Sequence, residues 1–178
     1  AQPTYGLITN VGKAHLEGFG SEEGVFQGKT ELYDFIEKKD GLIFVNEDDH
    51  KLFFAIGNVA HIAFEPSEYS IIQEQPTLKL VRQNIEISTQ LVGTYNKENI
   101  VAAISIGAFF DVSLAKAAKA IVEYSPNNSR SQLLKQNGKT LTFDAYNANP
   151  SSMQAAITAF GKRSGKKAVI LGYMAELG

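Results

Sequence analysis

Three short apolar runs in the first part of the sequence constrain the fold more than any other feature. They lie at residues 5–10, 42–45 and 61–64. Ser21 can cap a helix predicted over residues 21–38, and a shorter helix is predicted over residues 47–56, so that helices alternate with the runs. Because short apolar runs separated by helices are typical of buried parallel strands, this order predicts a parallel sheet with right-handed crossovers.

The pattern changes after residue 68, where apolar and polar residues begin to alternate. Three such segments lie at residues 69–72, 78–82 and 85–88. With Gln83 and Asn84 at a hairpin turn, they predict an antiparallel appendage to the sheet. Two helices are predicted next, over residues 99–110 and over residues 113–124, the second of which Ser113 can cap.

The stretch Ser-Pro-Asn-Asn-Ser at residues 125–129 has the composition of a linker, and we expect a domain boundary there. Residues 1–127 would form part of one domain and residues 128–178 the start of another. Asn137 and Gly138 predict a hairpin in the second part, between strands over residues 132–136 and 140–143. A helix over residues 150–160 and a strand over residues 168–171 complete the predicted α/β unit.

Composition narrows the classes of function. The 178 residues include 17 basic and 19 acidic side chains and no Cys, so we expect no nucleic-acid partner, no disulfide and no Cys-based zinc site. No apolar run approaches the roughly 18 residues of a membrane span and the first residues do not resemble a signal peptide, so we expect a cytoplasmic location. Because the sequence lacks an initial Met, we also expect it to be a piece of a longer protein.

Two Gly-Lys-Thr triplets invite comparison with loops that hold phosphate through backbone N–H groups and a Lys. The triplet that contains Lys29 would need a glycine where Glu23 stands, and the one at residues 138–140 would need a glycine at Leu133. A strand also follows the second triplet where a helix should begin. We therefore expect neither triplet to hold a phosphate in this way.

His15 and Lys29 are candidates for a metal site. His15 follows the first apolar run, where ligands of parallel sheets gather, although a solvated loop residue gives the same pattern. Lys29 is either an ordinary surface cation of its helix or a neutral amine that adds carbon dioxide, and the resulting carbamate is an anion able to bind magnesium.

Polar side chains gather at two later junctions. Asn96 and Asn99 lie at the start of a predicted helix, either as its cap or as amide groups that face the edge of a base. Arg130 follows the expected boundary, and Asp-Ala-Tyr-Asn-Ala-Asn-Pro at residues 144–150 joins a strand to a helix. Anions and sugar hydroxyl groups bind at such places, although each residue alone could be structural.

Taken together, five segments closely resemble the Mur ligases. The similar segments are residues 8–21, 93–99, 130–132, 144–153 and 170–178. Their order and spacing are most similar to those of the member that joins D-alanyl-D-alanine to UDP-N-acetylmuramoyl-tripeptide during peptidoglycan precursor synthesis. The resemblance implies part of a P-loop-type central ATPase domain without its phosphate loop, followed by an incomplete Rossmann-like unit.

The resemblance also implies a mechanism and roles for the candidate residues. ATP would activate a peptide carboxylate as an acyl phosphate, which the amine of D-alanyl-D-alanine attacks. His15 would bind magnesium and Lys29, as a carbamate, would lie beside a second magnesium ion. The remaining candidates would surround ATP, with Asn96 and Asn99 near the adenine, Arg130 at the terminal phosphate, Asp144 at the ribose or hinge, and Asn147 and Asn149 along the nucleotide and substrate cleft.

Two departures from the family pattern limit the resemblance. The family's phosphate loop and its Glu-containing magnesium motif are absent from these residues, so we expect the 178-residue chain to be inactive. We also expect the full-length protein to be a monomer. Tyr173 also stands where the family usually has an acid. The alternatives are another ligase of the superfamily, similar to folylpolyglutamate synthase, or a non-catalytic nucleotide-binding module.

Overall fold

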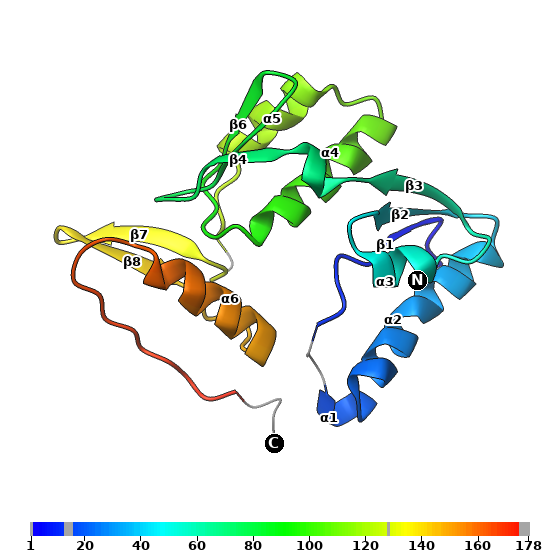
Figure 1. Cartoon of the computed structure of the whole chain (residues 1–178), viewed down its shortest axis with the longest axis horizontal. Helices are drawn as coiled ribbons and strands as arrows, with labels where there is room; N and C mark the ends of the chain where they lie inside the picture. Colours follow the sequence, from blue (N-terminus) through cyan, green and yellow to red (C-terminus); the bar gives the residue numbers. More distant parts are fainter. Residues whose placement is uncertain (1, 13–15, 128, 175–178) are drawn as a thin grey trace.

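Three groups of helices and strands follow one another along the chain in the computed structural model, which describes residues 2–12, 16–127 and 129–174 (Figure 1). The first group contains a parallel sheet, the second an antiparallel sheet and two long helices, and the third a hairpin and one helix. This arrangement confirms the predicted α/β class, with its parallel sheet, antiparallel appendage and C-terminal α/β unit.

The first sheet has the strand order β1-β2-β3, and both pairs of strands are parallel. Its strands are β1 (Tyr5–Leu7), β2 (Leu42–Asn46) and β3 (Ala60–Phe64). The predicted crossover helices are α2 (Glu22–Glu37) and α3 (His50–Phe54). Ser21 Oγ accepts a hydrogen bond of 3.0 Å from the Gly24 N–H and begins α2 as expected, whereas a short preceding helix, α1 (Leu16–Phe19), was not predicted.

The second group also follows the predicted order. After a short 3₁₀ helix, η1 (Pro66–Glu68), come the antiparallel strands β4 (Ser70–Gln73), β5 (Lys79–Arg82) and β6 (Ile85–Ser88). Gln83 and Asn84 have φ angles of 51° and 61°, the left-handed pair that a tight two-residue hairpin requires. The helices are α4 (Asn96–Phe109), which begins three residues earlier than expected, and α5 (Leu114–Glu123), which Ser113 caps.

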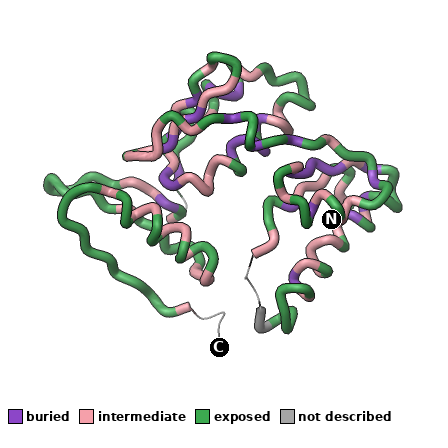
Figure 2. The backbone as a smooth tube through the Cα atoms, in the orientation of Figure 1, coloured by how far each residue is buried: buried purple, intermediate pink, exposed green. Residues whose placement is uncertain are grey.

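Both faces of β2 are buried, as expected for a central parallel strand. Ile43 and Val45 lie in one apolar cluster, with Tyr33 and Ile36 of α2, whereas Phe44 lies in the other. That second cluster joins the first sheet to the antiparallel sheet and to α4 and α5. Figure 2 shows that the buried positions are concentrated in the first two groups of helices and strands, so these two groups supply most of the core.

The third group contains the hairpin β7 (Gln132–Gln136) and β8 (Lys139–Phe143), followed by α6 (Pro150–Gly161). Asn137 and Gly138 form the predicted turn with φ angles of 51° and 71°. The predicted strand over residues 168–171 is wrong. These residues pair with no strand in the described chain, and Ile170 is 99% exposed. An apolar run forms a strand only beside another strand with which it can form hydrogen bonds, and the described residues supply none here.

Among the described residues, no helix combines the length and the apolar character that crossing a membrane requires.

The hydroxyl of Tyr33 is a buried polar group in the first apolar cluster. The Tyr33 side chain is 2% exposed, yet its hydroxyl has no hydrogen-bond partner among the described residues. An unpaired buried hydroxyl costs about 1–3 kcal/mol, so Tyr33→Phe is expected to raise the free energy of unfolding by about 1 kcal/mol. Urea unfolding of the two proteins near neutral pH measures this difference, and a lower stability of the variant would contradict it.

The pH dependence of the free energy of unfolding, compared between the wild-type protein and Tyr33→Phe, provides a second measurement. Burial, and to a smaller extent the charge of Asp49, raises the pKa of Tyr33 to about 12 from its ordinary value of 10.0. A raised folded-state pKa means that the contribution to stability is complete below pH 10 and is lost as the pH rises toward 12. The advantage of Tyr33→Phe should therefore grow by up to about 1.4 kcal/mol per pH unit in that window.

Candidate functional site

A cavity of about 1210 Å³ lies where the three groups meet. Its walls come from the loop after β1, the first turns of α4, the end of α5, the segment after residue 128 and the start of α6. All six residues that the sequence analysis placed around a nucleotide line this cavity: Asn96, Asn99, Arg130, Asp144, Asn147 and Asn149. Residues from both sides of the expected domain boundary are thus brought together.

The wall formed by α4 presents two amide side chains. Asn96 Nδ2 donates a hydrogen bond of 2.9 Å to the Val92 carbonyl oxygen, and Asn99 Nδ2 donates one of 3.3 Å to Asn96 Oδ1. The N-cap residue of α4 is Tyr95, whose side chain makes no capping bond. The interpretation of the Asn pair as a helix cap is therefore wrong, and the fixed Asn96 amide instead orients Asn99 at the cavity wall.

Another wall carries a cation held against an aromatic ring. The Cζ atom of Arg130 lies 3.8 Å from the centroid of the Tyr146 ring, and both side chains are exposed. Asp144, two residues before Tyr146, accepts a hydrogen bond of 3.2 Å from the buried Ser131 hydroxyl. A guanidinium, a carboxylate and an open ring face therefore lie together, a set suited to a ligand with an anionic end and a flat or hydroxyl-bearing part.

Asn149 has a structural role in addition to its place in the cavity lining. Its Oδ1 accepts a hydrogen bond of 2.9 Å from the Ser152 N–H, and Ser152 Oγ accepts one of 3.2 Å from the Asn149 N–H, which together form a capping box at the start of α6. Asn147 Oδ1 instead accepts from the neighbouring Ala148 N–H at 2.9 Å. Asn149 is thus the residue that caps the start of α6.

The capping box predicts two unequal losses of stability. Asn149→Ala is expected to lower the free energy of unfolding by about 1 kcal/mol without any ligand, the usual cost of removing a helix cap. Gln154→Ala, the matched control at an exposed position within α6, should change it by less than about 0.5 kcal/mol. Chemical denaturation of the three proteins measures both, and equal losses would show that the cap does not stabilise α6.

Lys29 lies at the edge of the site. Its Nζ donates a hydrogen bond of 2.9 Å from α2 to the carbonyl oxygen of Asn10, and Asn10 lines the cavity after β1. His15, the other predicted metal ligand, lies outside the described residues. Within the described ranges, no three His, Asp or Glu side chains are grouped closely enough to hold a metal ion.

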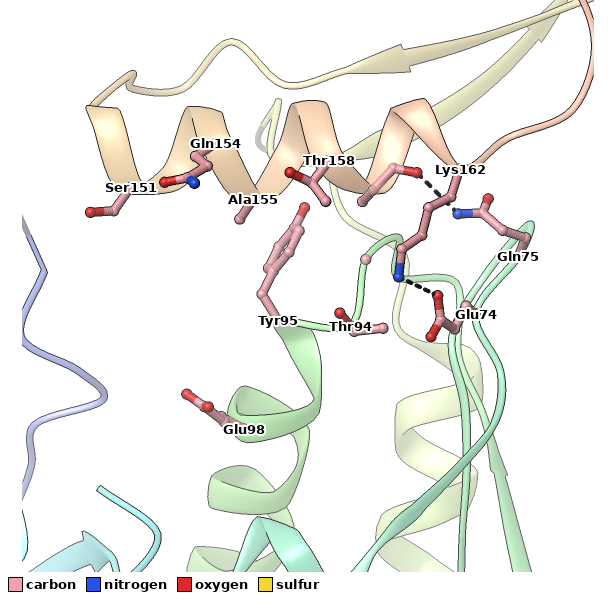
Figure 3. Close-up of a pocket in the computed structure, with 12 residues that line it drawn as sticks. Glu74, Gln75, Thr94, Tyr95, Glu98, Ser151, Gln154, Ala155, Thr158 and Lys162 are labelled. Carbon is pink, nitrogen blue, oxygen red and sulfur yellow. Dashed lines mark hydrogen bonds and ion pairs between the residues drawn. The ribbon is translucent and has the colours of Figure 1, made fainter. Parts of the chain in front are cut away.

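A second, smaller cavity of about 470 Å³ lies between α6 and the start of α4 (Figure 3). Lys162, the residue just after α6, forms an ion pair of 2.9 Å with Glu74, and Gln75 Nε2 donates a bond of 3.3 Å to the Ala159 carbonyl oxygen. Tyr95 and Glu98 line both cavities. Partial desolvation, and then the charges of nearby aspartates, raises the pKa of the Glu98 carboxyl.

Sequence reasoning missed three residues of the larger site. Tyr95 and Tyr146 both lie within segments recognised by resemblance, but neither was assigned a role. The third, Ser131, is 6% exposed and bonds to groups on both walls. Two aromatic residues beside the selected Asn and Asp residues were a usable signal, whereas a single Ser in a polar segment offered none.

Comparison with known proteins identifies the family to which the chain is similar. The family model described as the Mur ligase middle domain matches residues 1–107. The UDP-N-acetylmuramoyl-tripeptide–D-alanyl-D-alanine ligase of Bacillus subtilis is 33% identical over 190 residues, which cover 100% of this chain and 41% of the relative. The Escherichia coli protein of the same name is 29% identical over 195 residues, which cover 99% and 42%. The chain thus spans about two-fifths of these curated relatives.

Solved structures show the same fold. MurF from Acinetobacter baumannii gives a TM-score of 0.82 at 24% identity, with 99% of this chain and 41% of that chain covered. MurF ligase from Thermotoga maritima, solved in complex with ADP, gives 0.82 at 22% identity, with 100% and 44% covered. A folylpolyglutamate synthase from Thermotoga maritima is less similar, with a TM-score of 0.61 at 16% identity over 89% and 38% of the two chains.

Proposed function

The chain belongs to the Mur ligase family, and from this premise we propose that it is part of an ATP-dependent ligase that joins D-alanyl-D-alanine to UDP-N-acetylmuramoyl-tripeptide. One observation carries the proposal. The six side chains assigned to the nucleotide come from segments between residues 96 and 149 and line a single cavity. In this proposal residues 1–127 belong to the central domain and residues 128–178 begin the C-terminal domain, so that the nucleotide lies between the two.

The polar groups of the cavity suit the parts of ATP. We assign the adenine to the wall with Asn96 and Asn99, where an amide can match donors and acceptors on a base edge. Asp144 is assigned to the ribose, because a carboxylate accepts hydrogen bonds from hydroxyl groups. Arg130 is assigned to the terminal phosphate, which a guanidinium binds through paired hydrogen bonds. Asn147 and Asn149, which also line the cavity, are assigned to the part of the cleft between the nucleotide and the substrate.

The reaction needs charge to be offset where it builds up. The substrate carboxylate displaces ADP from the terminal phosphorus to give an acyl phosphate. The dipeptide amine then attacks the acyl carbon, phosphate leaves, and the nitrogen loses a proton to give the amide. Arg130 would stabilise the charge on the phosphoryl group as it is transferred in the first step and on the phosphate as it leaves in the second. It would also hold that group in line between the two walls.

We assign magnesium to His15 and Lys29, and the carbamate of Lys29 fits this role better than the amine does. Magnesium prefers oxygen ligands, and a carbamate supplies two oxygens while its N–H can keep the bond to the Asn10 carbonyl. When bound, the ion would supply positive charge beside the phosphates. The bond from Lys29 Nζ to Asn10, a residue that lines the cavity, supports this assignment.

The 178 residues alone are proposed to be inactive. They contain no Gly-x-x-x-x-Gly-Lys-Ser/Thr sequence, so they lack the loop that usually holds the triphosphate. The complete protein is proposed to act as a monomer in the cytoplasm. Sustained ATP turnover by the 178-residue chain would contradict the proposed inactivity.

The decisive experiment uses the polypeptide encoded by the complete reading frame that contains these residues. Release of ADP from ATP is measured with UDP-N-acetylmuramoyl-tripeptide, with and without D-alanyl-D-alanine. Release that requires both substrates is expected. Release with a folate and glutamate instead would favour the folylpolyglutamate synthase alternative, and no release from the folded protein would favour a non-catalytic nucleotide-binding module.

A further inference from the structure

A chain of two hydrogen bonds crosses the expected domain boundary at the larger cavity. The Tyr95 hydroxyl lies 2.6 Å from Ser131 Oγ, and Ser131 Oγ lies 3.2 Å from Asp144 Oδ2. A carboxylate can only accept, so Ser131 uses its single proton for Asp144. Tyr95 must then donate to Ser131, which gives the order Tyr95 to Ser131 to Asp144. We call these three residues the boundary relay.

Burial makes the boundary relay costly to break. Ser131 is 6% exposed and is one of three buried polar residues among the described parts of the chain, with Asn46 and Thr89. Desolvation is the main cause that raises the pKa of Tyr95, so its phenol keeps the proton that it donates. Removing one partner would leave a buried hydroxyl unpaired, which costs about 1–3 kcal/mol.

The backbone beside the boundary relay is held in an unfavourable conformation. Ser129 and Ser131, on either side of Arg130, have φ angles of 60° and 49°. Left-handed backbone costs a residue with a Cβ atom roughly 1–2 kcal/mol, and it persists where surrounding contacts impose it. The two bonds of the Ser131 hydroxyl are such contacts, and they act on the residue next to Arg130.

We infer that Ser131 and Tyr95 are positioning residues of the nucleotide site, an inference that rests on the proposed function. Ser131 holds the segment that carries Arg130 to the segment that carries Asp144. Tyr95, the residue before Asn96, ties both segments to the start of α4. The cation and the carboxylate are thereby kept at a fixed distance from the amide wall. This role requires no contact between Ser131 and the ligand.

The contacts in the smaller cavity should keep the C-terminal unit attached when the boundary relay is lost. Figure 3 shows Tyr95 beneath α6, with the bonds of Glu74 and Gln75 nearer the helix end that carries Lys162. These contacts remain when Tyr95 or Ser131 is changed. The C-terminal unit should therefore stay attached but sample a wider range of orientations.

The first test measures that range directly. The chain has no Cys, so Lys119→Cys and Lys139→Cys place one spin label in α5 and one at the start of β8 without background labelling. We expect Tyr95→Phe and Ser131→Ala each to broaden the distribution of distances between the labels. Tyr5→Phe is the matched control, because Tyr5 packs against Phe109 at the opposite end of α4. Unchanged distributions in both variants would overturn the inference.

A further substitution separates the hydroxyl from the backbone. Ser131→Gly removes the hydroxyl and also relieves the left-handed strain, whereas Ser131→Ala removes the hydroxyl alone. If the hydroxyl bonds position the segment, both variants broaden the distribution. Broadening by Ser131→Ala but not by Ser131→Gly would assign the effect to backbone strain and overturn the role of the hydroxyl.

The second test uses the polypeptide of the complete reading frame. Tyr95→Phe is expected to raise the KM for ATP about 3- to 10-fold, the effect of one hydrogen bond, and Tyr5→Phe to leave it unchanged. An unchanged KM in Tyr95→Phe, in an enzyme that is otherwise active, would overturn the positioning role. An inactive wild-type protein would refute the proposed function instead, and the label distances would still decide whether the boundary relay orders the two walls.

Discussion

Replacing Lys29 by alanine is expected to lower the rate of amide formation by the complete ligase about 10²–10³-fold, the usual effect of removing one charge-stabilising group from an active site. Lys29 connects α2 to the loop after β1 through its 2.9 Å bond to the Asn10 carbonyl oxygen. Under the proposed function its carbamate would bring negative oxygens to magnesium beside the cavity. Release of ADP at saturating substrate concentrations measures the loss.

Lys29→Arg distinguishes the carbamate from a simple cation. Arg keeps a positive charge and does not form a carbamate, so the carbamate hypothesis predicts that Lys29→Arg is as inactive as Lys29→Ala. Substantial activity in Lys29→Arg would contradict the carbamate and assign Lys29 a cationic role. Lys39→Ala, an exposed position just after α2, is the matched control and should retain full activity.

Local signals in the sequence predicted the positions of most helices and strands. Ser21 begins α2 because its hydroxyl satisfies a backbone N–H that the first helical turn leaves free. Asn137 and Gly138 make a hairpin because both tolerate the positive φ angles that the turn requires. Each of these outcomes depends on interactions within a few residues of the chain, so each was accessible without knowledge of the fold.

Features that depend on distant partners were less accessible. The apolar residues 168–171 have the composition of a strand but no neighbouring strand in the described chain, so the expected strand is absent. Asn149 was expected along a ligand cleft, and its capping of α6 became evident only from the bonds to Ser152. One side chain can serve a local and a distant purpose, and composition does not separate the two.

The candidate site was predicted by resemblance and not by spacing. Asn96 and Asp144 are 48 positions apart in the sequence, and no periodic pattern indicates that they share a cavity. The bond between Tyr95 and Ser131 likewise joins residues 36 positions apart, and no periodic pattern indicates it. The fold brings these residues together, so only similarity to a known arrangement could anticipate the site.

Arg130→Ala is the second substitution expected to have a large effect, lowering the rate of ADP release about 10²–10³-fold. Arg130 would neutralise charge on the transferring phosphoryl group, and its planar guanidinium can bind two phosphate oxygens at once. Arg130→Lys keeps the charge but loses this paired geometry, so it should recover only part of the rate. Full activity of Arg130→Ala would remove Arg130 from the proposed mechanism.

Tyr146 allows a stricter test, because its ring lies 3.8 Å from the Arg130 Cζ atom. A cation–π contact at an exposed site contributes about 0.5–1 kcal/mol, so Tyr146→Ala should lower the rate about 2- to 5-fold and Tyr146→Phe should preserve it. If the ring acts by orienting the guanidinium, Tyr146→Ala has no further effect once Arg130 is alanine. Independent, multiplicative losses would instead show that Tyr146 contacts the nucleotide in its own right.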